Sequence, residues 1–253
     1  MKEVIPMKQP LLLPYGRTEA LKYACSQLQN SGFVLTDTPS PAVTHLLLPV
    51  PSLGPDGSVK GGGDLADLLS RLPKDITVMG GNLSSVPSSY RKLDLLQNET
   101  YLSQNAAITA HCAIKLAMAQ LPCTLDGCPV LVVGWGRIGK CLGKLLMNMG
   151  ALVTVAARKE TDRAMLLALG YRAAPISQID PEQYRVIFNT APQLLLPDCS
   201  ASALQIDLAS KPGITGPNVI WARGLPNKDA PESSGALIAA HIANYLMETE
   251  VTT

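Results

Sequence analysis

The stretch that decides the fold is Val130-Leu131-Val132-Val133-Gly134-Trp135-Gly136-Arg137-Ile138-Gly139. It joins a short apolar run to glycines with the spacing G-x-G-x-x-G. An amphipathic segment follows as far as Met149, and a second apolar run covers Val153 to Ala157. A strand, a glycine-rich turn, a helix and a second strand in this order are typical of a dinucleotide-binding βαβ unit.

Each glycine of this unit has an expected task. Gly134 permits the tight turn, Gly136 lets the backbone approach a pyrophosphate, and Gly139 lets the helix pack closely on the strand. The N-terminus of the helix offers free N–H groups and the positive end of a dipole to phosphate. The cofactor-binding residues predicted here are Gly134, Trp135, Gly136, Arg137, Ile138 and Gly139. The alternative is that the glycines serve only the turn and its packing.

The end of the second strand indicates which dinucleotide is bound. In NAD sites an Asp or Glu about 20 residues after the glycines accepts a hydrogen bond from the ribose 2′-OH. Here the strand ends Ala156-Ala157-Arg158-Lys159, without an acid. Two cations suit a 2′-phosphate, and we therefore predict NADP, with Ala157, Arg158 and Lys159 at the cofactor. The alternative is a solvated Arg-Lys pair in a loop.

The rest of the chain continues the alternation of strands and helices. Apolar runs predict strands at 11–13, 33–35, 43–48, 76–79, 93–96, 129–133, 153–157, 185–189, 204–208 and 219–222. Amphipathic segments predict helices at 17–30, 64–72, 84–92, 105–121, 137–149, 161–169 and 230–247. The helix at 105–121 is expected to bury Ile114, Ala117, Met118 and Leu121, and residues 52–63, with five glycines, are expected to form a loop.

This pattern predicts the α/β class, with two doubly wound parallel-sheet domains and long interdomain helices. We expect residues 1–104 with 230–253 to form a flavodoxin-like substrate domain. Residues 105–229 are expected to form a Rossmann dinucleotide-binding domain.

Composition places the chain among ordinary globular proteins. Of its 253 residues 47% are apolar and 16% are charged, and the formal net charge is +1. Such a balance argues against a nucleic-acid or anionic-membrane surface. No apolar run approaches the roughly 20 residues of a membrane span, and residues 1–7 lack the apolar centre of a signal peptide. We expect a cytoplasmic protein with neither nucleic-acid nor membrane partners.

The cysteines give no sign of a metal site or a disulfide framework. All six lack the Cys-x-x-Cys spacing, at positions 25, 112, 123, 128, 141 and 199. We expect them to be reduced, partly buried thiols.

Further candidate residues follow other predicted strands, at the edge where open α/β sheets bind ligands. The cofactor-binding residues predicted there are Thr190, Ala191, Pro192, Leu208 and Ala209. The predicted substrate-binding residues are Ser210, Lys211, Leu225, Pro226, Ser233 and Ser234. Lys211 would neutralise a substrate carboxylate or polarise an imine; the alternative is a surface lysine in a loop.

Two residues are predicted to be catalytic, Lys211 and His111. His111 lies one turn from the start of the helix predicted at 105–121 and could act as a general acid or base. A partly buried structural histidine is the alternative. Glu232 is expected to cap the last helix rather than to act in catalysis. The sequence holds neither a Ser-His-Asp arrangement nor a cluster of metal ligands, and no metal is predicted.

From about Ser103 to Leu246 the chain resembles the A-subunit family of dipicolinate synthase, the enzyme with which spore-forming bacteria make pyridine-2,6-dicarboxylate. The resemblance rests on four stretches, namely 134–140, 153–159, 187–192 and 206–213, and continues at 224–226. It implies a two-domain dehydrogenase-like fold, NADP, and a B-subunit partner. The implied reaction, in sporulation, oxidises a dihydro- or tetrahydrodipicolinate-type ring to dipicolinate.

Three positions depart from the pattern of that family. Glu232 stands where the family has a lysine, and His111 stands where it has a glutamate. The glycine-rich turn after the first strand is here Pro14-Tyr15-Gly16-Arg17. Because a carboxylate near the substrate would repel a dicarboxylate, two alternatives stay open: an NADP-dependent dehydrogenase of another small carboxylate, and a non-catalytic NADP-binding regulatory subunit. In each case we expect a homo-oligomer.

Overall fold

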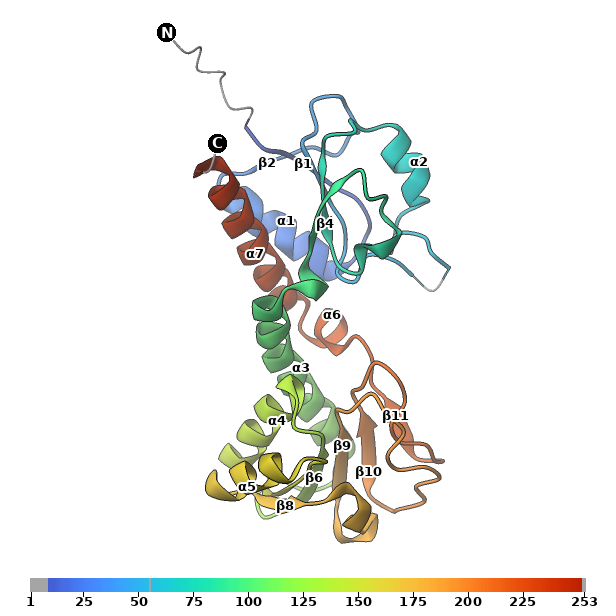
Figure 1. Cartoon of the computed structure of the whole chain (residues 1–253), viewed down its shortest axis with the longest axis vertical. Helices are drawn as coiled ribbons and strands as arrows, with labels where there is room; N and C mark the ends of the chain where they lie inside the picture. Colours follow the sequence, from blue (N-terminus) through green and yellow to red (C-terminus); the bar gives the residue numbers. More distant parts are fainter. Residues whose placement is uncertain (1–8, 55, 252–253) are drawn as a thin grey trace. The chain divides into compact units, whose positions relative to one another are not determined.

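The computed structural model describes residues 9–54 and 56–251 (Figure 1). These form two compact units. The first unit contains the described residues up to Gln104 and those from Ala230 onward, and the second unit is Asn105–Asp229. Each is built on one parallel sheet with helices, which confirms the predicted fold class.

The first unit is built on a five-stranded sheet with the order β2-β1-β3-β4-β5, in which every pair is parallel. Its strands are β1 (Leu11–Pro14), β2 (Val34–Leu35), β3 (His45–Leu47), β4 (Thr77–Gly80) and β5 (Arg91–Asp94). This is the strand order of flavodoxin, in which the direction of winding reverses between β1 and β3.

Helices cover this sheet and bury its apolar side chains. They are α1 (Glu19–Asn30), α2 (Leu65–Ser70), α7 (Pro231–Val251) and the first turns of α3 (Glu99–Gln120). The side chain of Thr18 begins α1 by accepting a hydrogen bond from the Leu21 N–H, and Asp64 begins α2 in the same way. Helices α1 and α7 lie side by side (Figure 1), and Gly235 permits their contact because a Cβ there would lie 2.6 Å from the Ala20 carbonyl oxygen.

The prediction of a helix at 84–92 is wrong. The segment forms only one 3₁₀ turn, Leu83–Ser85, before β5 begins at Arg91. Pro87 lacks the N–H that a helix would need there, and the ammonium group of Lys92 donates to the carbonyl oxygens of Leu83 and Val86 instead.

The strand predicted at 93–96 begins and ends two residues earlier, because Asp94 turns the chain. Its carboxylate accepts hydrogen bonds from the N–H groups of Asn82, Leu83 and Leu96. Leu95–Gln97 then forms a 3₁₀ turn.

The second unit is built on a six-stranded parallel sheet with the order β11-β10-β9-β6-β7-β8. Its strands are β6 (Pro129–Val133), β7 (Leu152–Ala156), β8 (Arg172–Ala174), β9 (Val186–Asn189), β10 (Leu204–Asp207) and β11 (Val219–Trp221). Taken from β8, the sequence of strands is 3-2-1-4-5-6, the order of the Rossmann fold. Winding therefore reverses between β6 and β9, where ligands bind in such sheets.

The helices of this unit are the rest of α3, α4 (Arg137–Asn148), α5 (Glu160–Ala168) and α6 (Leu225–Asp229). The apolar stripe of α4 faces inward, with Leu142 and Leu146 fully buried, although Met149 past its end is 38% exposed. Two 3₁₀ turns, Ile176–Gln178 and Pro181–Gln183, lie between β8 and β9. The sequence interpretation missed both β8 and α6.

Helix α3 differs from its prediction in extent and in its buried face. It begins six residues early because the side chain of Asn98 accepts a hydrogen bond from the Tyr101 N–H. Ile114 and Ala117 are buried as expected, but Met118 is 48% exposed, and Cys112 and Ala113 are buried instead. All six cysteines are free thiols, of which Cys123 is exposed rather than partly buried.

Candidate functional site

The glycine-rich turn lies at the point where the second sheet reverses its winding. Gly134 follows β6 with φ +101°, a conformation that favours glycine, and its N–H donates to the Ala156 carbonyl at 2.9 Å. A Cβ on Gly134 would lie 2.6 Å from Oγ1 of Thr190, the residue after β9. The turn therefore requires glycine for its backbone and for its contact with the neighbouring strand end.

The other two glycines of the motif differ in their surroundings. Gly139 is buried in the first turn of α4, where a Cβ would lie 2.3 Å from the Gly134 carbonyl oxygen. A Cβ on Gly136, in contrast, would meet no atom within 4 Å apart from its neighbours in the chain. Gly139 is thus needed for packing within the protein, whereas Gly136 faces open space.

The residue that precedes α4 gives its N-terminus no side-chain cap. Gly136 precedes the helix and provides no side chain to accept its first N–H groups. Arg137 is exposed at the first helical position, and Ile138 is half-buried. Free N–H groups and the positive end of a helix dipole favour a phosphate at such a place.

Trp135 takes part in the turn with its backbone only. Its indole packs edge-on against the Tyr171 ring, with centroids 5.3 Å apart. Both aromatic rings line a groove of about 460 Å³ beside α4, together with Lys140 and Lys144. The Trp135 side chain is therefore held on the flank of α4.

The residues that follow β9 lie against the glycine turn and form a second side of the candidate site. Thr190 donates twice to the Val133 carbonyl oxygen, from its N–H at 2.8 Å and from its hydroxyl at 3.0 Å. Ala191 is half-buried and Pro192 is exposed. The structure thus brings the residues predicted at 134–139 and 190–192 to one point of the sheet.

A buried carboxylate shapes the neighbouring loops, and the sequence interpretation missed it. Asp207 ends β10 and is completely buried. Its oxygens accept hydrogen bonds from the Asn189 side chain and from the N–H groups of Ala209, Gly213 and Ile214, at 2.6–3.0 Å. The sequence did contain a signal for it, because Asn189 and Asp207 are polar residues at the ends of two otherwise apolar strands.

The loop after β10 holds several predicted site residues. Leu208 and Ala209 are buried, and the Ala209 carbonyl accepts a hydrogen bond from the indole of Trp221 at 3.1 Å. Ser210 and Lys211 are exposed, and Lys211 has no ion-pair partner in the described part of the chain. Lys211 therefore presents a free cation just beyond the carboxyl end of β10.

The end of β7 collects positive charge. Ala157 is buried, whereas Arg158 and Lys159 are exposed, and neither cation pairs with an acid among residues 9–54 and 56–251. A third cation, which the sequence interpretation missed, is half-buried in the first turns of α5. Nη1 of Arg163 donates to the carbonyls of Ala157 and Arg158, at 2.9 and 2.8 Å. Arg163 thereby holds the turn that carries the two exposed cations.

The remaining predicted residues belong to other parts of the two units. Leu225 begins α6 with its side chain buried, and Pro226 is half-buried. In the first turn of α7, Ser233 is exposed, and the buried Ser234 hydroxyl has no hydrogen-bond partner among the residues that the structure describes. His111 is exposed on α3, and the packing expected for a structural histidine is not seen.

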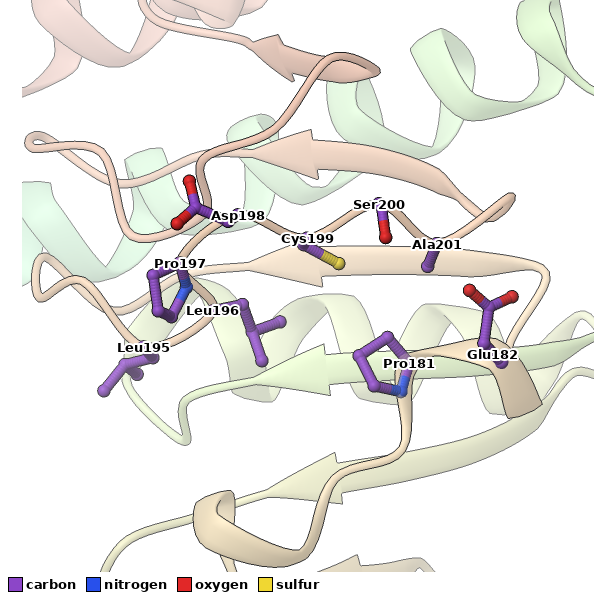
Figure 2. A pocket seen from close by; sticks show the side chains of 9 residues that line it. All are labelled: Pro181, Glu182, Leu195, Leu196, Pro197, Asp198, Cys199, Ser200 and Ala201. Atoms are coloured by element: carbon purple, nitrogen blue, oxygen red, sulfur yellow. The ribbon is translucent and has the colours of Figure 1, made fainter.

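A separate pocket of about 280 Å³ lies beside the connection between β9 and β10 (Figure 2). It is lined by Pro181, Glu182 and residues 195–201, and the side chains of Cys199 and Ser200 point toward Pro181 and Glu182. None of the predicted site residues lines it. We therefore place the candidate site at the reversal point and not in this pocket.

No group of three or more His, Cys, Asp or Glu side chains within residues 9–54 and 56–251 is placed to hold a metal ion. In the same residues no helix combines the length and the apolar character that crossing a bilayer requires.

The strand order and the glycine turn at the reversal point are those of the Rossmann dinucleotide-binding fold. Solved structures with this two-unit fold include the dipicolinate synthase A subunits from Bacillus halodurans and from Bacillus subtilis. Their TM-scores are 0.79 and 0.79 at 21% and 20% identity, over 94% and 97% of this chain and 98% of each of theirs.

More distant structures have the same fold. D-lactate dehydrogenase from Salmonella matches with a TM-score of 0.64 at 12% identity, over 94% of this chain and 96% of its own. In sequence, a glutamyl-tRNA reductase from Helicobacter hepaticus is 29% identical over 124 residues, 46% of this chain. The match spans only 28% of that relative. No protein-family model matches the chain.

Proposed function

We propose that the protein is an NADP-dependent oxidoreductase that oxidises a dihydro- or tetrahydrodipicolinate-type ring to dipicolinate. The observation that carries the proposal is the N-terminus of α4 without a side-chain cap, beside the Gly134–Thr190 contact, with two cations at the end of β7 that pair with no acid among the described residues. The fold likeness to the dipicolinate synthase A subunits supports the choice of substrate.

The residues present fit NADP. Residues 134–139 and the N-terminus of α4 would hold the pyrophosphate, and Arg158 and Lys159 would bind the 2′-phosphate. Residues 190–192, with Leu208 and Ala209, would flank the nicotinamide end. When bound, NADP⁺ supplies an acceptor for a hydride from a ring carbon of the substrate.

The protein would mainly orient the ring, because aromatisation itself drives the loss of a hydride and a proton. Lys211 would neutralise a substrate carboxylate, helped by the hydroxyl of Ser210. Contacts from Leu225 and Pro226 would complete the part of the substrate site in the second unit, with Leu225 acting through its backbone because its side chain is buried. The assignment of Ser233 and Ser234, in the first unit, to the substrate stays a prediction. The exposed His111 would accept the proton.

One observation favours a second candidate, an NADP-dependent dehydrogenase of another small carboxylate. Glu232 is exposed in the first turn of α7, where the resembling family has a lysine. A carboxylate there disfavours a dianionic substrate by charge repulsion. The proposal also includes a B-subunit partner, a homo-oligomer, a cytoplasmic location and a role in sporulation.

The test is NADPH formation by the full chain, with the product of the dihydrodipicolinate-forming aldol condensation as substrate. It is run with NADP⁺ and with NAD⁺, and with and without the candidate B subunit. NADPH formation faster than the uncatalysed rate supports the proposal. Tight NADP binding without turnover in any arm would contradict it and favour the regulatory subunit, and turnover of other small carboxylates alone would favour the second candidate.

A further inference from the structure

The first unit has its own reversal point, which the proposed function does not use. Winding of its sheet reverses between β1 and β3, and the turn Tyr15-Gly16-Arg17 leads from β1 into α1 at the carboxyl edge. Ligands of open α/β sheets bind at such points. By its position, this turn borders a second candidate ligand site.

The glycine-rich loop of the sequence packs against this turn. Gly16 has φ +113°, and a Cβ there would lie 2.7 Å from Cγ of Pro49 and 2.8 Å from the Lys60 carbonyl oxygen. A Cβ on Gly61 would lie 2.5 Å from the Arg17 carbonyl oxygen. The Gly63 N–H donates to the Tyr15 hydroxyl at 3.0 Å. The glycines thus let the backbone of the 52–63 loop pack directly against Tyr15-Gly16-Arg17. This contact fixes the shape of the turn.

A cavity of about 330 Å³ opens beside the turn, a volume at the lower end of the range for small-ligand sites, about 300–1,000 Å³. Its lining includes residues 16–19, Lys22 and Cys25. Arg17 is exposed and has no acidic partner in the described part of the chain. Lys22 pairs with Glu19 at 3.7 Å, which leaves the charge of Arg17 uncompensated in the lining.

The other lining groups add donors and no further negative charge. The Thr18 hydroxyl oxygen accepts a hydrogen bond from the Leu21 N–H at 3.2 Å, and its own proton remains available to a ligand. Burial raises the pKa of the Cys25 thiol to about 11, so that it stays neutral. The cavity therefore offers one guanidinium and one hydroxyl donor to a small anion.

We propose that this cavity is a binding site for a small planar carboxylate, with Arg17 as the residue that recognises the carboxylate through paired hydrogen bonds. A guanidinium matches a carboxylate in geometry as well as in charge, which an ammonium does not. Only the identity of the ligand rests on the proposed function, since a dipicolinate-type ring carries two such groups.

The experiment is calorimetric titration of the full chain with pyridine-2,6-dicarboxylate, pyridine-2-carboxylate and inorganic phosphate. Wild type is compared with Arg17→Gln, Arg17→Lys and the control Arg71→Gln, which removes an exposed arginine from the end of α2. Arg17→Gln is expected to weaken dicarboxylate binding about tenfold or more. Arg17→Lys should show an intermediate loss because it keeps the charge and loses the paired geometry. NADP affinity and thermal stability should not change.

The outcomes separate this site from the proposed function. Dicarboxylate binding that depends on Arg17, in a protein that does not oxidise the ring, supports the site and contradicts the function. Ring oxidation with an unchanged KM in Arg17→Gln contradicts the site and leaves the function. The site is also overturned if wild type does not bind the dicarboxylate, if Arg17→Gln binds it as wild type does, or if phosphate binds as tightly through Arg17.

Discussion

The side-chain amide of Asn189 donates to Oδ1 of Asp207 at 2.9 Å, and both residues are completely buried at the last positions of adjacent strands. The same amide nitrogen donates to the Ala191 carbonyl, and Asp207 holds the N–H groups of Gly213 and Ile214. One buried pair therefore sets the course of both loops that border the candidate cofactor site.

Replacing the carboxylate should damage these loops and the fold together. Asp207→Asn puts an amide where four donors now converge, and the free energy of unfolding should fall by about 1.5–3 kcal/mol, the usual effect of losing hydrogen bonds to a charged group. Urea unfolding measures the change. Asp37→Asn, which alters a carboxylate outside this network, should have no such effect, and equal stability of the two variants would contradict this account.

Alanine substitutions at the two glycines of the turn should have different effects, one on stability and cofactor affinity and the other on cofactor affinity alone. Gly139→Ala places a Cβ 2.3 Å from the Gly134 carbonyl oxygen, and it should cost about 1–3 kcal/mol of stability as well as cofactor affinity. The methyl group of Gly136→Ala meets no atom within 4 Å beyond the neighbouring residues of the chain, so that it should affect a bound pyrophosphate and leave stability unchanged. Unfolding and NADP titration of both variants test this. An unchanged NADP affinity in Gly136→Ala would show that no ligand approaches that backbone.

The sequence was sufficient for the parts of the fold that depend on local patterns. The apolar run at 129–133, the glycines after it and the stripe of α4 each follow from spacing, and the structure has all three. The prediction failed where individual side chains, and not the apolar pattern, decide the course of the backbone. Lys92 and Pro87 prevent the helix at 84–92, and Asp94 ends its strand early through a contact with Asn82.

The candidate site shows the same division. The glycine turn and the residues after β9 were predicted because strand ends of a parallel sheet meet at one edge. Arg163 was missed because its contact is with backbone carbonyls several residues earlier. Asp207 was missed as a separate residue because its four partners come from three segments of the chain. Neither contact leaves a periodic signal.

Lys211 gives a prediction about turnover. Lys211→Ala should reduce oxidation of the diacid precursor at least about tenfold, because a charge-assisted contact with a carboxylate is lost. NADPH affinity should stay within a few-fold, since Lys211 is assigned to the substrate. Steady-state kinetics and NADPH titration are compared with Lys144→Ala, an exposed lysine on α4. Unchanged turnover in Lys211→Ala would remove this residue from the substrate site.

The lowered pKa of His45 allows a prediction of how the free energy of unfolding depends on pH. Burial, and then the positive charge of Arg91, lowers the pKa of His45 from 6.5 to about 4. Between these values the unfolded chain binds a proton that the folded chain does not, and stability should fall as the pH drops from about 6.5 to about 4. The slope is at most about 1.4 kcal/mol per pH unit, less for a side chain that is only partly buried. Urea unfolding across this range should show a smaller slope in His45→Asn; an equal slope would exclude His45 as the cause.

Preference for NADP over NAD is the prediction with the most direct structural basis. The strand end at Ala157 has no carboxylate to pair with a free 2′-OH, and a carboxylate there would repel a 2′-phosphate. Arg158 and Lys159 are exposed and unpaired within the described residues, on a turn that Arg163 holds through two carbonyls. One charge-assisted hydrogen bond is worth about 1.5–3 kcal/mol, equivalent to about tenfold to a hundredfold in affinity.

Titration of both cofactors against wild type, Arg158→Ala and Arg163→Ala tests the preference. Arg158→Ala should lose NADP affinity and keep NAD affinity, because only NADP carries the phosphate. Arg163→Ala should lose affinity for both, because the turn itself loosens, and the exposed Arg172→Ala serves as the control. The preference should also shrink with added salt, which screens a half-exposed phosphate contact. Equal affinity of wild type for the two cofactors, or no loss of NADP affinity in Arg158→Ala, would show that Arg158 and Lys159 are only a solvated pair.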